Sequence, residues 1–526
     1  METLDAIQLP YPGVVGASLL VILGVLLLFP LDTGHFIIIN QHPWDFFQTK
    51  AKQQFEYNAT ALLKEGLQTG RSAFRLVTNM VTYLILKDQY AEEIKSDSRF
   101  GAHEAVDPVL LVDLPGFETM FQGSLHNQVP PMAVRALNKE LVNLTPFLSE
   151  EAMNCLQTRW TDSAEWHDVS IPETVLALIA QMTTRALLGP ELCRNPEWLE
   201  IAKSFTTNRA IAVAAVQSWP HFLQPVIHWF LSPCRALRRQ IQCARNILLP
   251  VLERERRAYR SDQPTKREFS NLAFIDQYAK GARYDATMAQ LRIIAVAFQT
   301  TSDLVEKVIA RLCKHPELIP PLREEVVSAL GKNGLQSHSL RKLTLMESVM
   351  KETQRLEPAV ISTSPPNIVT FLPTGLLLTW LPAAVGMFRL AKEKVTLKDG
   401  TVVPKGTNIA FANDLRFDPE MYPEPETFDG YRFQRMREDP EKIDLTPFTK
   451  TRMSHLAFGH GKHACPGRFL ACDEAKVILC HILLNYEIRA VEGAPPELRT
   501  RGIFVQLDPG AMMSVKRREN EITLHG

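Results

Sequence analysis

The sequence predicts a mainly α-helical fold with small β-sheets, in one large domain behind an N-terminal transmembrane helix. Three observations support this prediction. A glycine-bracketed loop carries Cys465 directly before a long apolar-periodic segment at about residues 467–485. A second periodic segment covers residues 285–314, and the chain begins with an apolar run at residues 14–29.

The composition favours one domain that binds apolar molecules. The 526 residues contain no internal repeat, low-complexity linker or charge block, so we assign residues 33–526 to a single domain. Lys plus Arg and Asp plus Glu both total 58, which gives no electrostatic reason to expect nucleic acid as a partner. The eight cysteines are scattered without a disulfide framework, which fits a reducing compartment.

The first 32 residues are predicted to be a single membrane anchor. The apolar run at residues 14–29 is shorter than the roughly 20 residues that span a bilayer core, and weakly apolar residues extend it. Glu2 and Asp5 argue against a cleaved signal peptide, and Lys50 and Lys52 favour a cytosolic position for the following domain. A buried first helix is the alternative.

Periodic apolar residues predict helices at residues 44–67, 138–160 and 172–188. Residues 205–231 are rich in Trp, Phe and Ile, which suits either core helices or a membrane-leaning lid. Residues 395–406 predict a β-hairpin, because the Asp399-Gly400 pair is a typical tight-turn sequence.

The segment at residues 285–314 is expected to form a helix that crosses the whole domain. Asp285 can cap its N-terminus, Pro316 follows its end, and its length is about 45 Å at roughly 1.5 Å per residue. Four polar residues, 299–302, interrupt its apolar centre. Hydroxyls there can bond a carbonyl four residues back and open the turn, which leaves room for a small ligand.

The loop around Cys465 is suited to present a metal ligand. Gly459 and Gly461 permit positive φ or a close approach to a flat ligand, and Pro466 removes one amide donor. The following helix points its N-terminal dipole at the sulfur and favours a thiolate. The alternative is a buried structural cysteine beside a glycine turn.

The spacing Phe458-x-x-Gly-x-x-x-Cys465-x-Gly resembles the heme-binding signature of the cytochrome P450 monooxygenases, in the version typical of fungal secondary metabolism. The resemblance implies the cytochrome P450 fold and heme, with the Cys465 thiolate as the iron ligand and Phe458 and Gly459 in the cofactor-binding loop. It further implies that His463, Arg389 and Arg135 serve the heme propionates.

The long helix resembles the distal helix of that family, which receives dioxygen and delivers protons. Ala297 stands at the small-residue position and Thr300 at the threonine position, both expected in catalysis. Gln299, between them, is included in the expected catalytic group; it stands where many members carry an acid, and it cannot relay a proton by ionising.

A further set of residues resembles the structural ion-pair triad of the family. Glu352 and Arg355, three apart on one helix, and Arg432 downstream are expected to share one carboxylate between two guanidiniums and thereby position the cysteine loop.

The resemblance therefore implies a monooxygenase on the endoplasmic reticulum membrane with a cytosolic catalytic domain. It would use dioxygen, and electrons from NADPH through NADPH-cytochrome P450 reductase. We expect an apolar small-molecule substrate, a terpenoid or polyketide intermediate of fungal secondary metabolism. Two alternatives stay open: a heme-thiolate isomerase or dehydratase, which Gln299 would permit, and a non-enzymatic, membrane-anchored helical protein.

Residues 362–384 depart from the family pattern. Their core, residues 368–381, is apolar, prolines lie in and around it, and no helix or strand period is sustained. An adapted substrate loop is one interpretation. We favour a gene-model error in which an intron is read as coding sequence.

Overall fold

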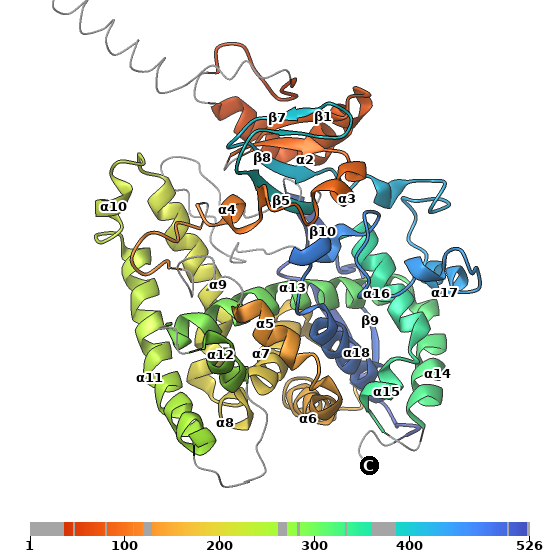
Figure 1. Cartoon of the computed structure of the whole chain (residues 1–526). Coiled ribbons are helices and arrows are strands. Elements are labelled where there is room, and N and C mark those ends of the chain that lie inside the picture. The colour runs from red at the N-terminus through yellow and green to blue at the C-terminus, as the bar shows by residue number, and fades with distance from the viewer. Residues whose placement is uncertain are drawn as a thin grey trace, which may run out of the picture.

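The computed structural model describes most of the chain, at residues 36–45, 48–78, 81–108, 110–118, 129–260, 271–280, 284–331, 334–358, 386–501 and 504–522. A layer of helices forms the larger part, and a sheet-bearing part that includes β1, β2, β5 and β8 lies at one end (Figure 1). The predicted anchor, residues 1–32, and the segment at residues 362–384 lie outside the described residues. Within the described ranges, no helix combines the length and apolarity needed to cross a membrane.

Ten long helices build the helical part of the described chain: α5 (Val129–Leu137), α6 (Leu141–Trp160), α7 (Ile171–Leu188), α9 (Pro196–Gln217), α11 (Ser232–Arg260), α12 (Asn271–Ala279), α13 (Ala286–Lys314), α14 (Ile319–Leu330), α16 (Thr344–Leu356) and α18 (Arg468–Asn485). Short helices connect them: α3 (Ala91–Ile94), α4 (His103–Val106), α8 (Pro190–Cys193), α10 (Gln224–Ile227), α15 (Ser337–Leu340) and α17 (Arg432–Met436). Helix α2 (Thr49–Gln68) instead packs on the main sheet (Figure 1).

The predicted long helices are confirmed, and the differences lie at their ends. The segment expected from residue 44 becomes helical only at Thr49, after Gln48 adopts a left-handed conformation with φ of 56°. In the stretch at residues 205–231, α9 ends at Gln217 and α10 begins at Gln224. Pro220 lies between them, and its missing amide hydrogen prevents one continuous helix.

Helix α13 runs through the middle of the helical part (Figure 1). The Asp285 carboxylate accepts hydrogen bonds from the backbone N–H groups of Thr287 at 3.0 Å and Met288 at 3.1 Å, so the predicted cap is confirmed. Buried residues of α13, α7 and α18 belong to one apolar core. Because α13 and α18 share this core, the segment that follows Cys465 is held near the centre of α13.

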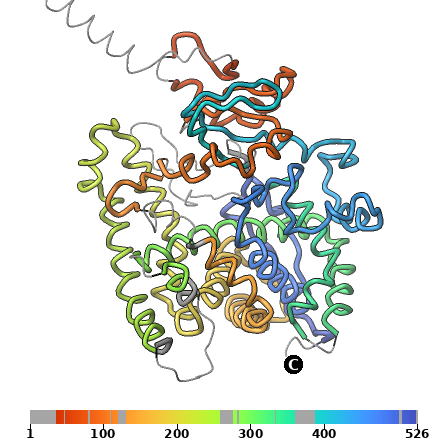
Figure 2. The backbone as a smooth tube through the Cα atoms, in the orientation of Figure 1, coloured from red at the N-terminus to blue at the C-terminus, as the bar shows by residue number. Residues whose placement is uncertain are grey.

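The main sheet joins segments that are far apart in sequence, as Figure 2 shows for the early and late strands. Its order is β1 (Ala73–Val77), β2 (Thr82–Leu86), β8 (Asn408–Phe411), β5 (Gly386–Ala391), β3 (Phe100–Gly101). The other sheets pair β4 (His167–Ser170), β12 (Met512–Arg517) and β9 (Tyr486–Ala490), then β10 (Leu498–Arg501) with β11 (Phe504–Leu507), and β6 (Val395–Thr396) with β7 (Val402–Val403).

The predicted hairpin is confirmed as the antiparallel pair β6 and β7. Gly400 in its turn has φ of +87°, a conformation that side-chain-bearing residues rarely adopt. The mainly helical fold with small sheets is therefore as expected.

Candidate functional site

An internal cavity lies between α13 and the loop that carries Cys465. Its volume is about 310 Å³, at the lower end of the roughly 300–1,000 Å³ typical of ligand pockets. Four residues singled out from the sequence line it together: Cys465, Phe458, Ala297 and Thr300. The cavity thus brings the Cys465 sulfur and the centre of α13 to one site.

The backbone of the cysteine loop requires its glycines. Gly459 and Gly461 have φ of +65° and +74°, as the sequence suggested. A Cβ atom on Gly461 would also stand 2.6 Å from the carbonyl oxygen of Lys95, so a side chain would displace that backbone. The Cys465 N–H donates to the Phe458 carbonyl at 2.8 Å and closes the loop.

The Cys465 sulfur faces the start of α18. Burial raises the pKa of the Cys465 thiol, while the backbone N–H groups of Gly467 and Arg468 act in the opposite direction. Backbone N–H groups that point at a sulfur stabilise its thiolate form, together with a metal cation bound to that sulfur. The Arg468 guanidinium also donates to the Cys465 carbonyl at 2.6 Å, which holds the loop against the helix.

One stripe of α13 forms the wall that carries Ala297 and Thr300. The lining residues are Arg292, Ile293, Val296, Ala297, Thr300, Thr301 and Leu304. The Thr300 hydroxyl donates to the Val296 carbonyl at 3.0 Å, the bond to a carbonyl four residues back that was predicted. Gln299 is not among the lining residues, because each helical step of about 100° turns it off the stripe.

A group of basic side chains lies beside the cavity. Burial lowers the pKa of His463 to about 4, with Arg389 as the next cause, and the His463 ring makes an edge contact with His103 at 6.1 Å between centroids. Arg389 is buried, which lowers its pKa to about 10. Its Nη1 donates to the Phe388 carbonyl at 2.7 Å, but its Nε has no hydrogen-bond partner among the described residues.

This basic group fits an anionic cofactor. The Arg389 guanidinium is buried and no carboxylate among the described residues pairs with it, so it is suited to a carboxylate brought by a ligand, while the neighbouring His463 ring can donate an N–H. Arg135 is exposed and donates to the Lys462 carbonyl at 3.3 Å, on the neighbouring loop. Together with the sulfur of Cys465, these residues fit heme, which carries both an iron and carboxylate groups.

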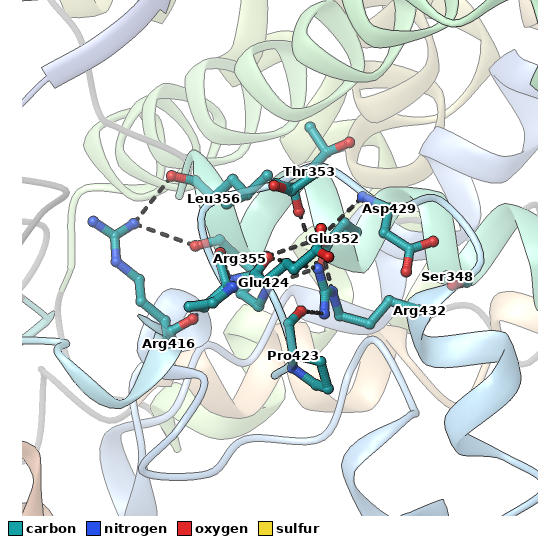
Figure 3. A network of polar contacts seen from close by, with 12 residues as sticks. Ser348, Glu352, Thr353, Arg355, Leu356, Arg416, Pro423, Glu424, Asp429 and Arg432 are labelled. Atoms are coloured by element: carbon teal, nitrogen blue, oxygen red, sulfur yellow. Dashed lines mark hydrogen bonds and ion pairs between the residues drawn. The ribbon is translucent and has the colours of Figure 1, made fainter. Parts of the chain in front are cut away.

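Glu352, Arg355 and Arg432 come together as a buried network (Figure 3). Arg355 donates to both Glu352 oxygens at 2.7 Å, and the Arg432 Nε donates to Glu352 at 2.9 Å. The two guanidiniums also donate to backbone carbonyls, among them those of Arg416 and Thr427. The network therefore ties α16 to the segment at residues 416–432, which leads to the cysteine loop.

Helix α16 also bonds directly to the segment before Cys465. The Lys351 ammonium donates to the Pro447 carbonyl at 2.7 Å, and the Glu347 carboxylate accepts from the Phe448 N–H at 2.9 Å. A buried contact of 2.9 Å joins Gln354 to His455. Since Phe448 packs edge-on against Phe458, these bonds determine where the loop lies.

The structure adds four polar residues to the cavity that the sequence reasoning missed: His103, Arg292, Gln354 and Glu474. Arg292 could have been found, because it lies eight residues before Thr300 and shares its helical face. Glu474 lies on α18, accepts a hydrogen bond from the Thr183 hydroxyl at 2.7 Å, and has its pKa raised to about 8 by burial.

Comparisons with known proteins agree on the family. The sequence model of the cytochrome P450 family matches residues 124–369 and 381–515. The fumitremorgin C monooxygenase of Neosartorya fischeri is 90% identical, and that of Aspergillus fumigatus is 86% identical, with alignments covering all of each chain. A crystal structure of a cytochrome P450DA heme domain superposes with a TM-score of 0.67 at 15% identity, over 93% of this chain and 99% of that one. The family match leaves out residues 370–380, within the segment at residues 362–384 that was expected to be atypical.

Proposed function

Because the chain belongs to the cytochrome P450 family and is a monooxygenase, we propose that it oxidises fumitremorgin C, or a close structural analogue, at a heme held by Cys465. The single observation that carries the substrate is the 90% identity to a fumitremorgin C monooxygenase across the whole of both chains. This replaces the broader expectation of a terpenoid or polyketide. Family membership also removes the non-enzymatic alternative, and the monooxygenase activity removes the isomerase or dehydratase.

The residues around the cavity divide between holding heme and surrounding the substrate. Heme bound through a thiolate supplies the activation of dioxygen. Cys465 would hold the iron, while Arg389, His463 and Arg135 would bind or border the propionates. The apolar side chains of α13, among them Val296 and Ala297, exclude water from the substrate and leave space beside Thr300.

Proton delivery would use the Thr300 hydroxyl, whose Oγ1 holds a proton at the cavity wall. In the structure that proton is donated to the Val296 carbonyl, and rotation about the Cα–Cβ bond turns it toward the cavity. Gln299 neither ionises nor lines the cavity, so we infer that water or another acid supplies Thr300.

The test combines a spectrum with turnover. The heme-loaded, reduced protein under carbon monoxide should show the strong red shift of a thiolate-ligated heme. Incubation with NADPH, NADPH-cytochrome P450 reductase and fumitremorgin C should then yield a product that has gained oxygen. A thiolate spectrum without oxidation of fumitremorgin C would overturn the substrate, and a missing thiolate spectrum would overturn the role of Cys465.

We also propose that residues 1–32 anchor the enzyme in the endoplasmic reticulum membrane, with the catalytic domain in the cytosol beside its reductase. The apolar run at residues 14–29 supports this. Removal of residues 1–32 should move the protein from the microsomal pellet to the supernatant. Continued sedimentation with intact reductase-dependent turnover would contradict the anchor.

For residues 362–384, we propose an insertion foreign to the enzyme, such as an intron read as coding sequence. The interruption of the family match at residues 370–380 supports this proposal. Deletion of residues 362–384 should raise the fraction of protein that binds heme. Loss of heme or activity on deletion would show instead that the segment belongs to the enzyme.

A further inference from the structure

Arg292 is an unusual side chain for the wall in which it lies. It lines the cavity on the same stripe of α13 as Ala297 and Thr300, with Ile293 and Val296 as its neighbours on that stripe. Burial lowers the pKa of Arg292, and the Asp107 carboxylate opposes that shift. A guanidinium in such surroundings is stabilised only by acceptors for its N–H groups.

Other partly buried arginines near α13 have such acceptors. Arg209 donates to the Phe117 carbonyl at 2.9 Å, and Arg256 donates to the Asp276 carboxylate at 2.6 Å. Arg292 makes no hydrogen bond or ion pair with any residue that the structure describes. Its donors are therefore free to meet a ligand in the cavity.

The charges around Arg292 indicate what kind of ligand oxygen it would meet. His103 also lines the cavity, and its pKa is lowered first by burial and next by the nearby Arg292 guanidinium. The Asp107 carboxylate acts on the same two side chains with opposite sign. The buried Arg209 guanidinium adds a second positive charge that Asp107 also acts on. Because the neighbouring side chains of this wall are apolar, a carbonyl oxygen of the substrate accepts from the Arg292 guanidinium without bringing a further charge that would have to lose its water.

We propose that Arg292 is a specificity-determining residue, whose guanidinium donates hydrogen bonds to a neutral carbonyl oxygen of the substrate. This deepens the proposed function and rests on it for the identity of the natural substrate. Arg292 lies eight residues before Thr300, a rise of about 12 Å along the helix.

The experiment uses the heme-loaded full chain and two ligands of nearly equal shape, fluorene and 9-fluorenone, of which only the second carries a carbonyl. Binding is followed by the change in heme absorption. The wild type should bind 9-fluorenone about tenfold or more tightly than fluorene. Arg292→Met should abolish this preference, and Arg292→Lys should retain part of it. Arg239→Met, an exposed change on α11, is the control and should behave as the wild type.

Four results would overturn the proposal. The first is equal binding of the two ligands by the wild type, and the second is an unchanged preference in Arg292→Met. The third is Arg292-dependent binding of fluorene-9-carboxylate that is tighter than the binding of 9-fluorenone, and the fourth is loss of heme from Arg292→Met. The third would mean an anionic ligand, and the fourth a role in holding the cofactor.

Turnover separates this inference from the proposed function. With fumitremorgin C, Arg292→Met should raise KM about tenfold or more with heme content unchanged. If the wild type does not oxidise fumitremorgin C while the preference for 9-fluorenone still depends on Arg292, the proposed substrate fails and the inference stands. If fumitremorgin C is oxidised with the same KM by Arg292→Met, the inference fails and the proposed substrate stands.

Discussion

The two walls of the cavity are built on different principles. Behind the lining of the cysteine loop, polar groups are bonded to one another, as in the Glu352 network and the bond from Arg468 to the Cys465 carbonyl. On the side of α13, apolar side chains dominate, and Arg292 has no bonded partner in the described part of the chain. Directional polar contacts fix the position of one metal ligand, whereas apolar burial accepts a range of shapes and leaves recognition to a few polar groups.

The largest effect is expected at the ligand itself. Cys465→Ala should remove the thiolate spectrum and all turnover, because no other soft anion lines the cavity within the described residues. Carbon monoxide difference spectra and product formation measure this. Cys243→Ala, at an exposed cysteine of α11, should leave both unchanged. Turnover by Cys465→Ala would falsify the heme-thiolate assignment.

The next effect tests whether the loop wall depends on the buried network. Glu352→Gln should destabilise the protein by about 3–5 kcal/mol and reduce its heme content, since Arg355 and Arg432 would stay buried without a carboxylate. Unfolding in urea and the ratio of heme to protein measure this.

The control for the Glu352 network is an exposed ion pair. Glu426→Gln removes a pair with Lys64 whose side chains are 75% and 61% exposed, and it should cost at most about 1 kcal/mol. Equal small effects of Glu352→Gln and Glu426→Gln would show that the loop is held by other contacts.

On the α13 wall, Thr300→Ala should change chemistry more than stability. Loss of the hydroxyl should divert reduced oxygen to peroxide, with heme content largely kept, as measured by the ratio of product to NADPH consumed. Thr158→Ala is a matched control, because Thr158 makes the same bond to a carbonyl four residues back, at 2.8 Å on the exposed side of α6. If coupling is unchanged in Thr300→Ala, Thr300 has no part in proton delivery.

The smallest effect concerns pH. Burial raises the pKa of Glu474 from 4.5 to about 8, so the folded protein holds a proton there that the unfolded chain has lost. This contribution to stability is complete below pH 4.5 and is lost as the pH rises toward 8. Between pH 5.5 and pH 8, the urea concentration at the midpoint of unfolding should therefore fall more for the wild type than for Glu474→Gln. The exposed Glu441→Gln should keep the wild-type slope, and equal slopes in all three would refute a neutral Glu474.

Elements with local signals could be predicted from the sequence. The position of Cys465 before α18, the positive φ of Gly459 and Gly461, the Asp285 cap and the Asp399-Gly400 turn depend on neighbouring residues. Such features are encoded within a few positions of the chain, because capping, turn formation and helical periodicity are short-range.

The tertiary structure alone decided which polar groups meet in the cavity. His103 and Asp107 approach Arg292 from a segment nearly 190 residues away, and Glu474 reaches the cavity from α18. It also decided which backbone carbonyls satisfy Arg355 and Arg432. Periodicity shows that a residue shares a helical face, but burial and the charges brought by distant segments decide whether that face meets core, water or ligand.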